Sequence, residues 1–351
     1  MEIDFGGGGE IRFEHIGRAG VITMTRPKAL NALTHSMVQA MARAMDAWEG
    51  DDGVAVVVLR GEGRAFCAGG DIMDIYRAGR EGRVLTAFFH DEYRLNARIH
   101  RFPKPWVSLI DGIVMGGGCG VSMNGAVRVF GDKGVIAMPE VGIGFFPDVG
   151  GSHFLPRLRG RSGFWMGLTG ERVKQGDALA VGAATHAVAS ADFEALLDAL
   201  CETGDAAASL MRHSARPEPE TGAQTFAAID RLFAGSSLEA VLSALENAAN
   251  EGDEFAARTL GTMNTRSPTS LHVAFRQLAL GADRSMDDCM RMEFRIVNRM
   301  LTGHDFYEGI RAVLVDRDNA PAWKPAGVDA VDPADIDAYF APLPGGELPL
   351  P

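Results

Sequence analysis

The sequence has no long apolar run and no excess of basic charge. A helix that crosses a membrane needs roughly 20 consecutive apolar residues, and none of the 351 residues begins such a run. The formal net charge of −12 argues against a general nucleic-acid binder, because phosphate contacts require a basic face. We therefore expect no nucleic-acid partner and no membrane-spanning helix.

Cysteine is also scarce. Four cysteines are scattered along the chain, and no pair has the spacing of a metal site or belongs to a disulfide framework. Residues 1–10 are acidic and glycine-rich, without the basic and apolar regions of a secretion signal. These features predict reduced thiols, no metal and a cytoplasmic location.

Several common catalytic motifs are missing. The chain has no G-x-S-x-G elbow for a serine nucleophile and no H-E-x-x-H metal motif. The G-x-G-x-x-G fingerprint of dinucleotide binding and the Gly-Lys-Ser/Thr end of a P-loop are absent as well. Any chemistry must therefore come from other residues.

The pattern of apolar residues predicts an α/β region followed by helices. Strands are expected at residues 11–16, 21–24, 54–59, 106–110 and 128–130, and helices at 33–48, 82–101 and 117–124. Helices are expected from about residue 189 onward, at 192–201, 223–233, 238–249, 253–263, 269–280, 286–300 and 306–313. We predict a core over residues 11–190, a helical region over 191–341, and flexible tails at 1–10 and 342–351.

Two carboxylates lie in one stretch that is rich in glycine and proline. Glu140 and Asp148 are separated by Gly142, Gly144 and Pro147 and flanked by Val, Ile and Phe. Acid–base chemistry uses carboxylates on rigid turns beside apolar surface, where burial can change their pKa. The alternative, from spacing alone, is two ordinary surface turns.

Two glycine clusters could present bare backbone N–H groups to a ligand. One is Gly69-Gly70, directly after a predicted strand and loop, and the other is Gly116-Gly117-Gly118. Two such donors on one carbonyl oxygen would form an oxyanion hole. Each cluster could equally be a tight turn. Together with the carboxylates, they suggest acyl chemistry.

These stretches, in this order, resemble the crotonase (enoyl-CoA hydratase/isomerase) superfamily. The matching pieces are Arg26-Pro27-Lys28-Ala29-Leu30-Asn31-Ala32-Leu33, Phe66-Cys67-Ala68-Gly69-Gly70-Asp71-Ile72, Gly116-Gly117-Gly118-Cys119 and Pro139-Glu140. The resemblance implies a spiral of ββα turns that binds an acyl-CoA. It also implies that the N–H groups of Gly70 and Gly117 hold the thioester oxygen, that Gly116 adjoins them, and that CoA lies along Lys28–Ala29 and Ala68, Gly69, Asp71 and Ile72.

The carboxylates indicate a subgroup. Hydratases of the superfamily resemble the chain at Glu140 but carry a second glutamate where this chain has Gly120. Asp148 stands where hydratases usually have a small residue. That pattern, with Glu92 at a matching substrate-site position and the long helical C-terminal part, is similar to the hydrolase subgroup that acts on 3-hydroxyisobutyryl-CoA in valine breakdown.

The resemblance implies a thioester hydrolase for a short 3-hydroxyacyl-CoA, with Glu140 and Asp148 catalytic and no cofactor beyond the CoA of the substrate. Glu140 would act as a general base or as a nucleophile, and sequence does not separate the two. The alternatives are an enoyl-CoA isomerase or hydratase on the same fold, and an acyl-CoA binder without turnover. The resemblance also allows a homo-oligomer, a trimer or a hexamer.

Overall fold

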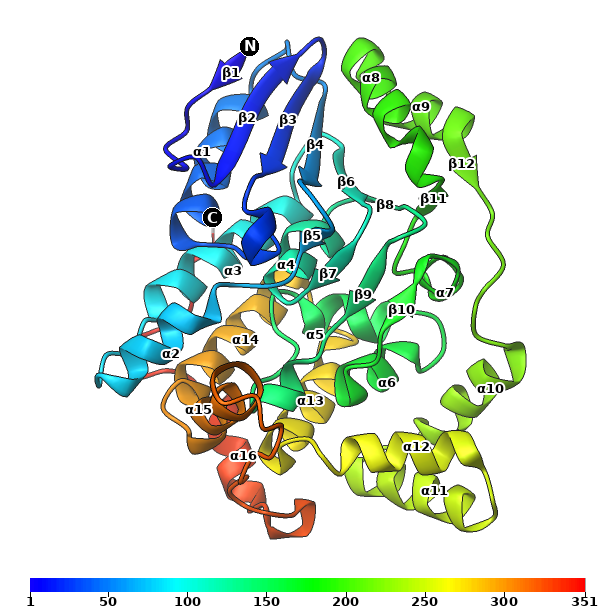
Figure 1. The fold of residues 1–351 in the computed structure, drawn as a ribbon. Helices are drawn as coiled ribbons and strands as arrows, with labels where there is room; N and C mark the ends of the chain where they lie inside the picture. Colours follow the sequence, from blue (N-terminus) through cyan, green and yellow to red (C-terminus); the bar gives the residue numbers. More distant parts are fainter. Residues whose placement is uncertain (351) are drawn as a thin grey trace.

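The computed structural model describes residues 1–350, and its centre is two β-sheets. The larger sheet has the order β1 (Glu2–Ile3), β2 (Ile11–Ile16), β3 (Ala19–Met24), β4 (Val56–Gly61), β6 (Trp106–Ile110), β8 (Val127–Phe130), β11 (His186–Val188) and β12 (Ser214–Ala215). The smaller sheet has the order β10 (Val173–Lys174), β9 (Val135–Ala137), β7 (Ile113–Met115) and β5 (Ala65–Cys67). The strands from β3 to β11 are parallel, as are β5, β7 and β9 (Figure 1).

Successive strands alternate between the two sheets. β4, β6 and β8 belong to the larger sheet, and the strand after each of them, β5, β7 and β9, belongs to the smaller one. A helical segment follows each pair: α2 (Ile72–Arg80) with α3 (Thr86–His100), α4 (Gly117–Met123), and the 3₁₀ turn η2 (Glu140–Ile143). The predicted spiral of ββα turns is therefore confirmed.

Burial explains why the strands read as apolar runs. Val56–Leu59 of β4 is 0% exposed, as a strand covered on both faces must be. One face packs on α1 (His35–Glu49), whose Met37, Met41 and Met45 are buried. Thr34 caps that helix, as predicted, by accepting a hydrogen bond from the Met37 N–H. The buried run of β4 and the capped helix α1 that packs on it are therefore both explained by local sequence.

The remaining helices all lie after residue 150. They are α5 (Gly151–Phe154), α6 (Ser162–Thr169), α7 (Gln175–Val181), α8 (Phe193–Thr203), α9 (Ala206–His213), α10 (Ala223–Leu232), α11 (Leu238–Asn250), α12 (Glu254–Met263), α13 (Pro268–Gly281), α14 (Met286–Met300), α15 (His304–Ile310) and α16 (Pro333–Phe340). A π-helical turn, Arg311–Val315, extends α15. In Figure 1, β1–β3 lie at one end of the molecule, and α11 and α12 lie at the opposite end.

The C-terminal helices return to the core. α14 packs on α3, and α13 packs on α5 and α6. The buried amide of Gln277 on α13 donates a hydrogen bond to the carbonyl oxygen of Pro147 at 2.6 Å. Asp305 on α15 leaves so little room that a Cβ on Gly144 would lie 2.0 Å from its carbonyl oxygen. The helical region therefore touches the loop that carries the two predicted carboxylates.

Most predicted elements are confirmed to within a few residues, but the prediction was incomplete. The helices without a predicted counterpart include α5, α6, α7, α9 and α16, and the four strands of the smaller sheet were not predicted either. The helix expected over 82–101 begins at Thr86. The segments predicted as flexible tails make specific contacts. β1 pairs with β2, while Leu348 is 1% exposed and Glu347 forms an ion pair with Arg295 at 2.9 Å.

Candidate active site

The candidate site lies at one edge of the smaller sheet. β5, β7 and β9 are neighbouring parallel strands, so their carboxyl ends meet at the same edge. β5 leads into Ala68–Gly70, β7 into Gly116–Gly117 and β9 into Pro139–Glu140. Ligands of α/β folds commonly bind beyond the carboxyl ends of parallel strands. The ββα spiral thus brings together three segments that are far apart in the sequence.

These segments line a cavity of 370 Å³, a size that suits a small ligand. Nine predicted site residues line it: Ala68, Gly69, Gly70, Ile72, Glu92, Gly116, Gly117, Glu140 and Asp148. Apolar side chains, among them Phe88, Phe89 and Phe145, form much of the remaining surface. The structure therefore gathers both predicted glycine loops and the carboxyl groups of Glu92, Glu140 and Asp148 in one place.

Gly70 and Gly117 present backbone donors to this cavity. The N–H of Leu33 donates to the Gly69 oxygen at 2.8 Å, and the Asp71 N–H donates to the Leu33 oxygen at 2.9 Å. This parallel bridge uses the neighbours of Gly70 and leaves the Gly70 N–H on the other side, where a Cβ on Gly117 would lie 3.2 Å from its nitrogen. Within residues 1–350, neither the Gly70 nor the Gly117 N–H has an acceptor. Two adjacent free donors are what an oxyanion hole needs.

Glycine at 116 allows the second loop to turn. Its φ of 47° is a left-handed conformation that residues with a Cβ rarely adopt. A Cβ there would also lie 3.3 Å from Oε1 of Glu140 and 3.4 Å from the Cα of Gly69. The loop at Gly116 is therefore packed closely against the loop at Gly69 and against the carboxylate of Glu140.

The carboxyl groups are buried in unequal surroundings. Glu92, Glu140 and Asp148 are 1%, 6% and 4% exposed. Asp148 accepts a hydrogen bond from the hydroxyl of Tyr93 at 2.8 Å. Glu92 Oε1 and Glu140 Oε2 have no partner within the described chain. Buried polar atoms are nearly always paired, so two unpaired oxygens in one cavity indicate groups that await a ligand or water.

Burial controls the protonation of this cluster. It raises the pKa of Glu140 well above the usual value, and the charge of Asp148 adds to the effect. Burial likewise raises the pKa of Glu92, helped by the charges of Asp148 and Glu293. The pKa of Asp148 rises to about 7, because burial outweighs the hydrogen bond from Tyr93. Perturbed carboxyl groups in a cavity are typical of acid–base sites.

The space at Gly120 is already filled. A Cβ at this position would lie 2.8 Å from both Oδ1 of Asn96 and the Cβ of Val149. Asn96 is fully buried, and Val149 has a φ of 54°, an unusual conformation for a β-branched residue. No larger side chain fits at position 120 unless these neighbours move.

Three predicted substrate-binding residues lie outside the cavity lining. Lys28 and Ala29 form an exposed turn, η1 (Pro27–Ala29), which adjoins the cavity loop because the Ala68 N–H donates to the Leu30 oxygen. The carboxylate of Asp71 forms an ion pair with Arg26 at 2.9 Å. Asp71 thus ties the loop Gly69-Gly70 to the turn Pro27–Ala29. Lys28 and Ala29 flank the cavity on its surface side.

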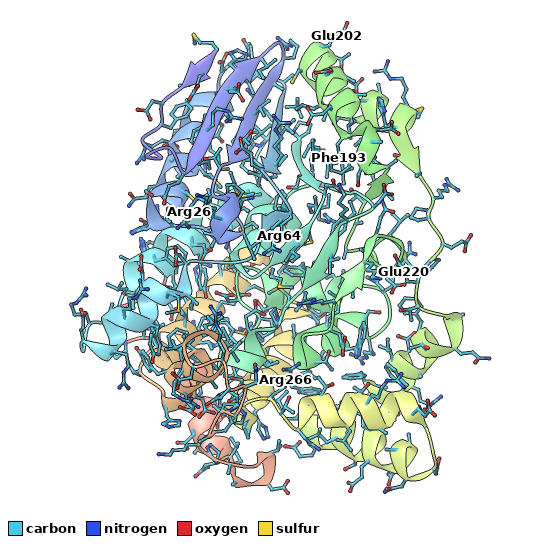
Figure 2. All side chains as sticks on the ribbon, in the orientation of Figure 1. Arg26, Arg64, Phe193, Glu202, Glu220 and Arg266 are labelled. Atoms are coloured by element: carbon cyan, nitrogen blue, oxygen red, sulfur yellow. The ribbon has the colours of Figure 1, made fainter. Side chains whose placement is uncertain are left out.

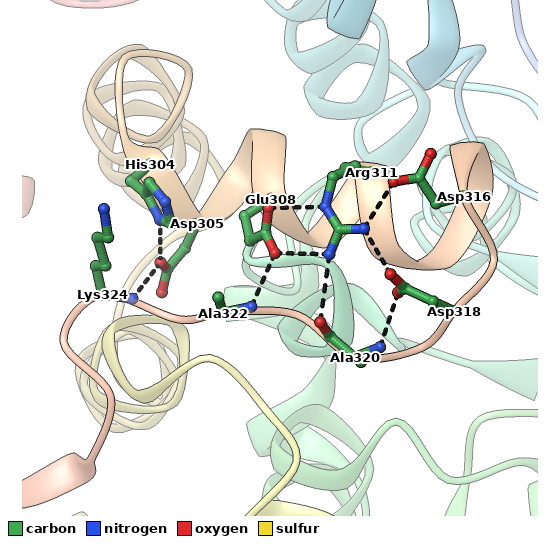
Figure 3. A network of polar contacts seen from close by, with 9 residues as sticks. All are labelled: His304, Asp305, Glu308, Arg311, Asp316, Asp318, Ala320, Ala322 and Lys324. Carbon is green, nitrogen blue, oxygen red and sulfur yellow. Dashed lines mark hydrogen bonds and ion pairs between the residues drawn. The ribbon is translucent and has the colours of Figure 1, made fainter.

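The C-terminal region supplies the outer wall. Val313 and Leu314 of the π-helical turn, together with Asn319, line the cavity. Figure 3 shows how this segment is held: Arg311 contacts Glu308, Asp316, Asp318 and the carbonyl oxygen of Ala320. The guanidinium of Arg311 lowers the pKa of Glu308 to about 2. Ion pairs within one segment therefore shape this wall.

Sequence reasoning missed three residues of the site. Tyr93 contacts Asp148, as described above. Arg266, labelled in Figure 2, lies between α12 and α13, lines the cavity, and donates to the Thr169 oxygen from Nε and Nη2. Glu293 on α14 is 0% exposed and bonds to the turn after Asp148. A signal existed for Glu293, since it falls on the apolar face of a predicted helix with Met290 and Val297.

Residues 1–350 hold neither a metal-binding cluster of side chains nor a helix that could span a membrane. No cluster of three or more His, Cys, Asp or Glu side chains has a geometry that could hold a metal ion. No helix in this range combines the length and the apolar character needed to cross a membrane.

Comparison with known proteins gives one family. A family model described as "Enoyl-CoA hydratase/isomerase" matches residues 19–340. A zebrafish (Danio rerio) protein named "3-hydroxyisobutyryl-CoA hydrolase, mitochondrial" is 43% identical and covers 98% of this chain and 92% of its own length. The human (Homo sapiens) protein of the same name is 39% identical, with 97% and 90% covered.

Two solved structures are similar over nearly the whole chain but carry other names. One is a carnitinyl-CoA dehydratase from Mycobacterium thermoresistibile, with a TM-score of 0.90, 41% identity, and 96% of this chain and 98% of that chain covered. The other is an enoyl-CoA hydratase from Rhodobacter sphaeroides, with a TM-score of 0.87, 38% identity, and 97% and 100% covered. All these names refer to a CoA compound, but they name different reactions: a hydrolase, a dehydratase and a hydratase.

Proposed function

The chain belongs to the enoyl-CoA hydratase/isomerase family, and we propose that within this family it is an acyl-CoA thioester hydrolase that converts 3-hydroxyisobutyryl-CoA to 3-hydroxyisobutyrate and CoA. The names of the relatives at about 40% identity support this activity. The observation that carries the choice is the replacement of a second glutamate by Gly120, together with a buried Asp148 in the same cavity as Glu140.

The thioester carbonyl oxygen would lie between the N–H groups of Gly70 and Gly117. Both donors are free. The carboxyl group of Glu140 lies next to Gly116, the residue before Gly117, where a Cβ would lie 3.3 Å from its Oε1. Glu140 acts in its ionised form, and either takes a proton from an attacking water or attacks the carbonyl carbon itself; its raised pKa makes that carboxylate a stronger base. In the first route, the water oxygen bonds to carbon, Glu140 holds the proton, and the oxyanion receives both N–H groups. Such donors act mainly on the transition state.

Asp148 is placed to act as the acid. When the carbon–sulfur bond breaks, the thiolate of CoA needs a proton, and Asp148 with a pKa of about 7 can carry one near neutral pH. Glu92 lies beside the proposed oxyanion hole, because a Cβ on Gly117 would lie 2.6 Å from its Oε1. Burial raises the pKa of Glu92 and so favours its neutral form, which can donate to the substrate hydroxyl without repelling the oxyanion.

The rest of CoA would run outward from this point. Its pantetheine would pass the loop Ala68–Ile72, and its phosphates would approach the exposed ammonium group of Lys28 on the neighbouring turn. No further cofactor is needed for hydrolysis, because water is the second substrate. The turn Pro27–Ala29 is thus assigned to the CoA moiety and the cavity to the acyl group.

The main alternative is hydration of an enoyl-CoA, the activity in the name of one similar structure. In the family pattern, that reaction uses a second glutamate at the position of Gly120. Here Asn96 and Val149 occupy the space that its side chain would need. The described site therefore offers a second carboxylate from a different direction, that of Asp148, and this arrangement favours hydrolysis.

Two substrates separate these reactions. We expect the purified protein to release thiol from 3-hydroxyisobutyryl-CoA and to leave crotonyl-CoA unchanged. A thiol reagent measures the first reaction, and the enoyl absorbance measures the second. Loss of that absorbance without thiol would mean hydratase activity. Isobutyryl-CoA, which lacks the hydroxyl, should react about 10²-fold more slowly or worse, because the polar groups that face the hydroxyl would stay unpaired. Equal rates would contradict the role given to Glu92.

The Tyr93→Phe variant tests the acid role of Asp148. Loss of the phenol removes a hydrogen bond that favours the charged form of Asp148, so its pKa should rise above about 7. The protonated form then persists to higher pH, and the alkaline limb of the kcat profile should shift upward. The rate of thiol release measured across the pH range checks this. A downward shift, or none, would remove Asp148 from that limb.

Location and assembly remain proposals. The cytoplasmic location proposed from the sequence agrees with four free, buried cysteines, while the curated relatives carry "mitochondrial" in their names. A trimer or hexamer is proposed from the family alone, and light scattering of the purified protein would measure it.

A further inference from the structure

The turn that carries Glu140 is anchored by the C-terminal part of the chain. Within the turn, the Phe145 N–H donates a hydrogen bond to the Glu140 oxygen at 3.0 Å. The next residue, Val141, is held from outside, because its oxygen accepts a hydrogen bond from the Ser267 N–H at 3.1 Å. The place of the Glu140 carboxyl group therefore depends on where the start of α13 lies.

α15 packs on the same turn through its backbone. A Cβ on Gly309 would lie 2.3 Å from the carbonyl carbon of Ile143 in η2, and a Cβ on Gly144 would lie 2.0 Å from the carbonyl oxygen of Asp305. Real Cβ atoms do not come this close, so glycine at both positions lets the two backbones touch. η2 is therefore fixed by α13 and α15 together.

The side chain of Asp305 joins these contacts. Asp305 is 7% exposed, and its Oδ2 accepts a hydrogen bond from the hydroxyl of the fully buried Ser267 at 2.6 Å. The same hydroxyl accepts one from the Ser270 N–H at 3.1 Å and so caps α13. The other oxygen, Oδ1, accepts one from the Lys324 N–H at 2.8 Å, and Nδ1 of His304 lies 3.1 Å from it (Figure 3). Hydrogen bonds to a carboxylate are stronger than those between neutral groups, so Asp305 firmly links the two segments.

The segment between α15 and Lys324 forms the outer wall of the cavity. Glu308, one turn after Asp305 on α15, accepts a hydrogen bond from the Ala322 N–H at 2.8 Å and pairs with Arg311 at 2.8 Å. Asp305 and Glu308 thus attach both ends of this wall to one helix. The wall residues that line the cavity are Val313, Leu314 and Asn319.

We propose that Asp305 is a positioning residue for Glu140, because its two carboxylate oxygens tie the cavity wall to the start of α13 and so to the turn that carries Glu140. This inference rests on the proposed hydrolase function, in which Glu140 acts on the thioester carbon. Asp305 touches no reacting atom and acts through Ser267 and Val141. The wall that encloses the substrate and the group that transforms it thus share one anchor.

Asp305→Asn breaks this link with the smallest change of shape. An amide has one oxygen, so it cannot accept from both Ser267 and Lys324 as the carboxylate does. We expect kcat for thiol release to fall by about 10²-fold, the cost of a misplacement of about 1 Å at a reacting group. KM should change less, because the glycine loops and the turn Pro27–Ala29 make no contact with the Asp305 carboxylate.

Ser267→Ala tests the path from Asp305 to Glu140. It removes the hydroxyl between Asp305 and α13 and keeps the backbone N–H that holds Val141. Two residues that act through one contact are not additive. The double variant should therefore be no slower than the slower of the two single variants. Losses of kcat that multiply in the double variant would mean that Asp305 acts by another route, and would overturn the proposal.

Asp177→Asn is the matched control, because Asp177 has the same burial and the same kinds of contact. It is also 7% exposed, and it accepts hydrogen bonds from the Thr221 N–H at 2.8 Å and from the Thr221 hydroxyl at 2.6 Å. It lies on α7, away from the residues that line the cavity. The control should lose thermal stability much as Asp305→Asn does, and keep its kcat. Wild-type kcat in Asp305→Asn, or an equal loss in Asp177→Asn, would overturn the proposal.

Hydrogen exchange over residues 139–146 gives a readout that needs no turnover. The N–H groups of this turn should exchange faster in Asp305→Asn than in the wild type and in Asp177→Asn. Equal exchange in all three proteins would overturn the positioning role. Wild-type protein that releases no thiol would instead refute the proposed function, and the exchange experiment would still decide whether Asp305 holds the turn.

Discussion

Replacing Glu140 by Gln is expected to lower kcat for 3-hydroxyisobutyryl-CoA by about 10²–10⁴-fold, the usual contribution of a positioned base. Gln has the same shape, so the cavity should keep its form, but it can neither take a proton nor attack the carbonyl carbon. Binding of a CoA thioester should change little, because Glu140 Oε2 has no partner among the described residues that would be lost. Thiol release and calorimetric titration with a thioester measure the two effects separately.

The control is Glu246→Gln, the same exchange at an exposed position on α11. It should leave both kcat and binding unchanged. Wild-type turnover in the Glu140→Gln variant would exclude Glu140 from the reaction. Loss of thioester binding together with turnover would instead mean that Glu140 holds the substrate rather than transforms it.

Adding one methyl group at Gly117 should have the second large effect. A Cβ there would lie 2.6 Å from Oε1 of Glu92 and 3.2 Å from the nitrogen of Gly70. The glutamate must move, and the new methyl group lies beside the second donor of the proposed oxyanion hole. We expect Gly117→Ala to lower kcat by about 10²–10³-fold, as for the loss of an oxyanion-hole donor.

The matched variant is Gly70→Ala, in the other loop of the same hole. Its Cβ would meet only the ring edge of Phe88, at 3.2 Å, and a side chain can give way more easily than backbone. Its kcat should fall less than that of Gly117→Ala. Thiol release under the same conditions compares the two, and equal effects, or a larger effect at Gly70, would contradict the geometry proposed for the hole.

Much of the fold was predictable because its signals are local. The cap at Thr34, the buried run of β4 and the helical period of α14 each depend on neighbours within a few residues. The glycine loops and the Glu140 turn could be identified for the same reason. Glycine widens and proline narrows the range of backbone conformations at its own position. The short helices α5, α6 and α7, the helices α9 and α16, and the short strands of the smaller sheet were missed.

The site could be predicted only in part, because its contacts join distant positions. Glu293 and Gly150 are separated by 143 residues, and Tyr93 and Asp148 by 55. A pairing over such distances leaves no local pattern. The sequence did place the charged Glu293 on the apolar face of a predicted helix, and this is the signal that could have identified it.

By itself, the amino-acid sequence determined the main strands of the larger sheet, most of the long helices, the two glycine loops and the two carboxylates Glu140 and Asp148, all through local backbone preferences and residue chemistry. Tertiary structure decided which of these groups share a cavity, because three parallel strands end at one edge of a sheet. It also decided their protonation, since burial and like charge exist only after the C-terminal helices pack on the core. Lys28 and Ala29 show the same division: the sequence identified the turn, and packing left it exposed on the surface.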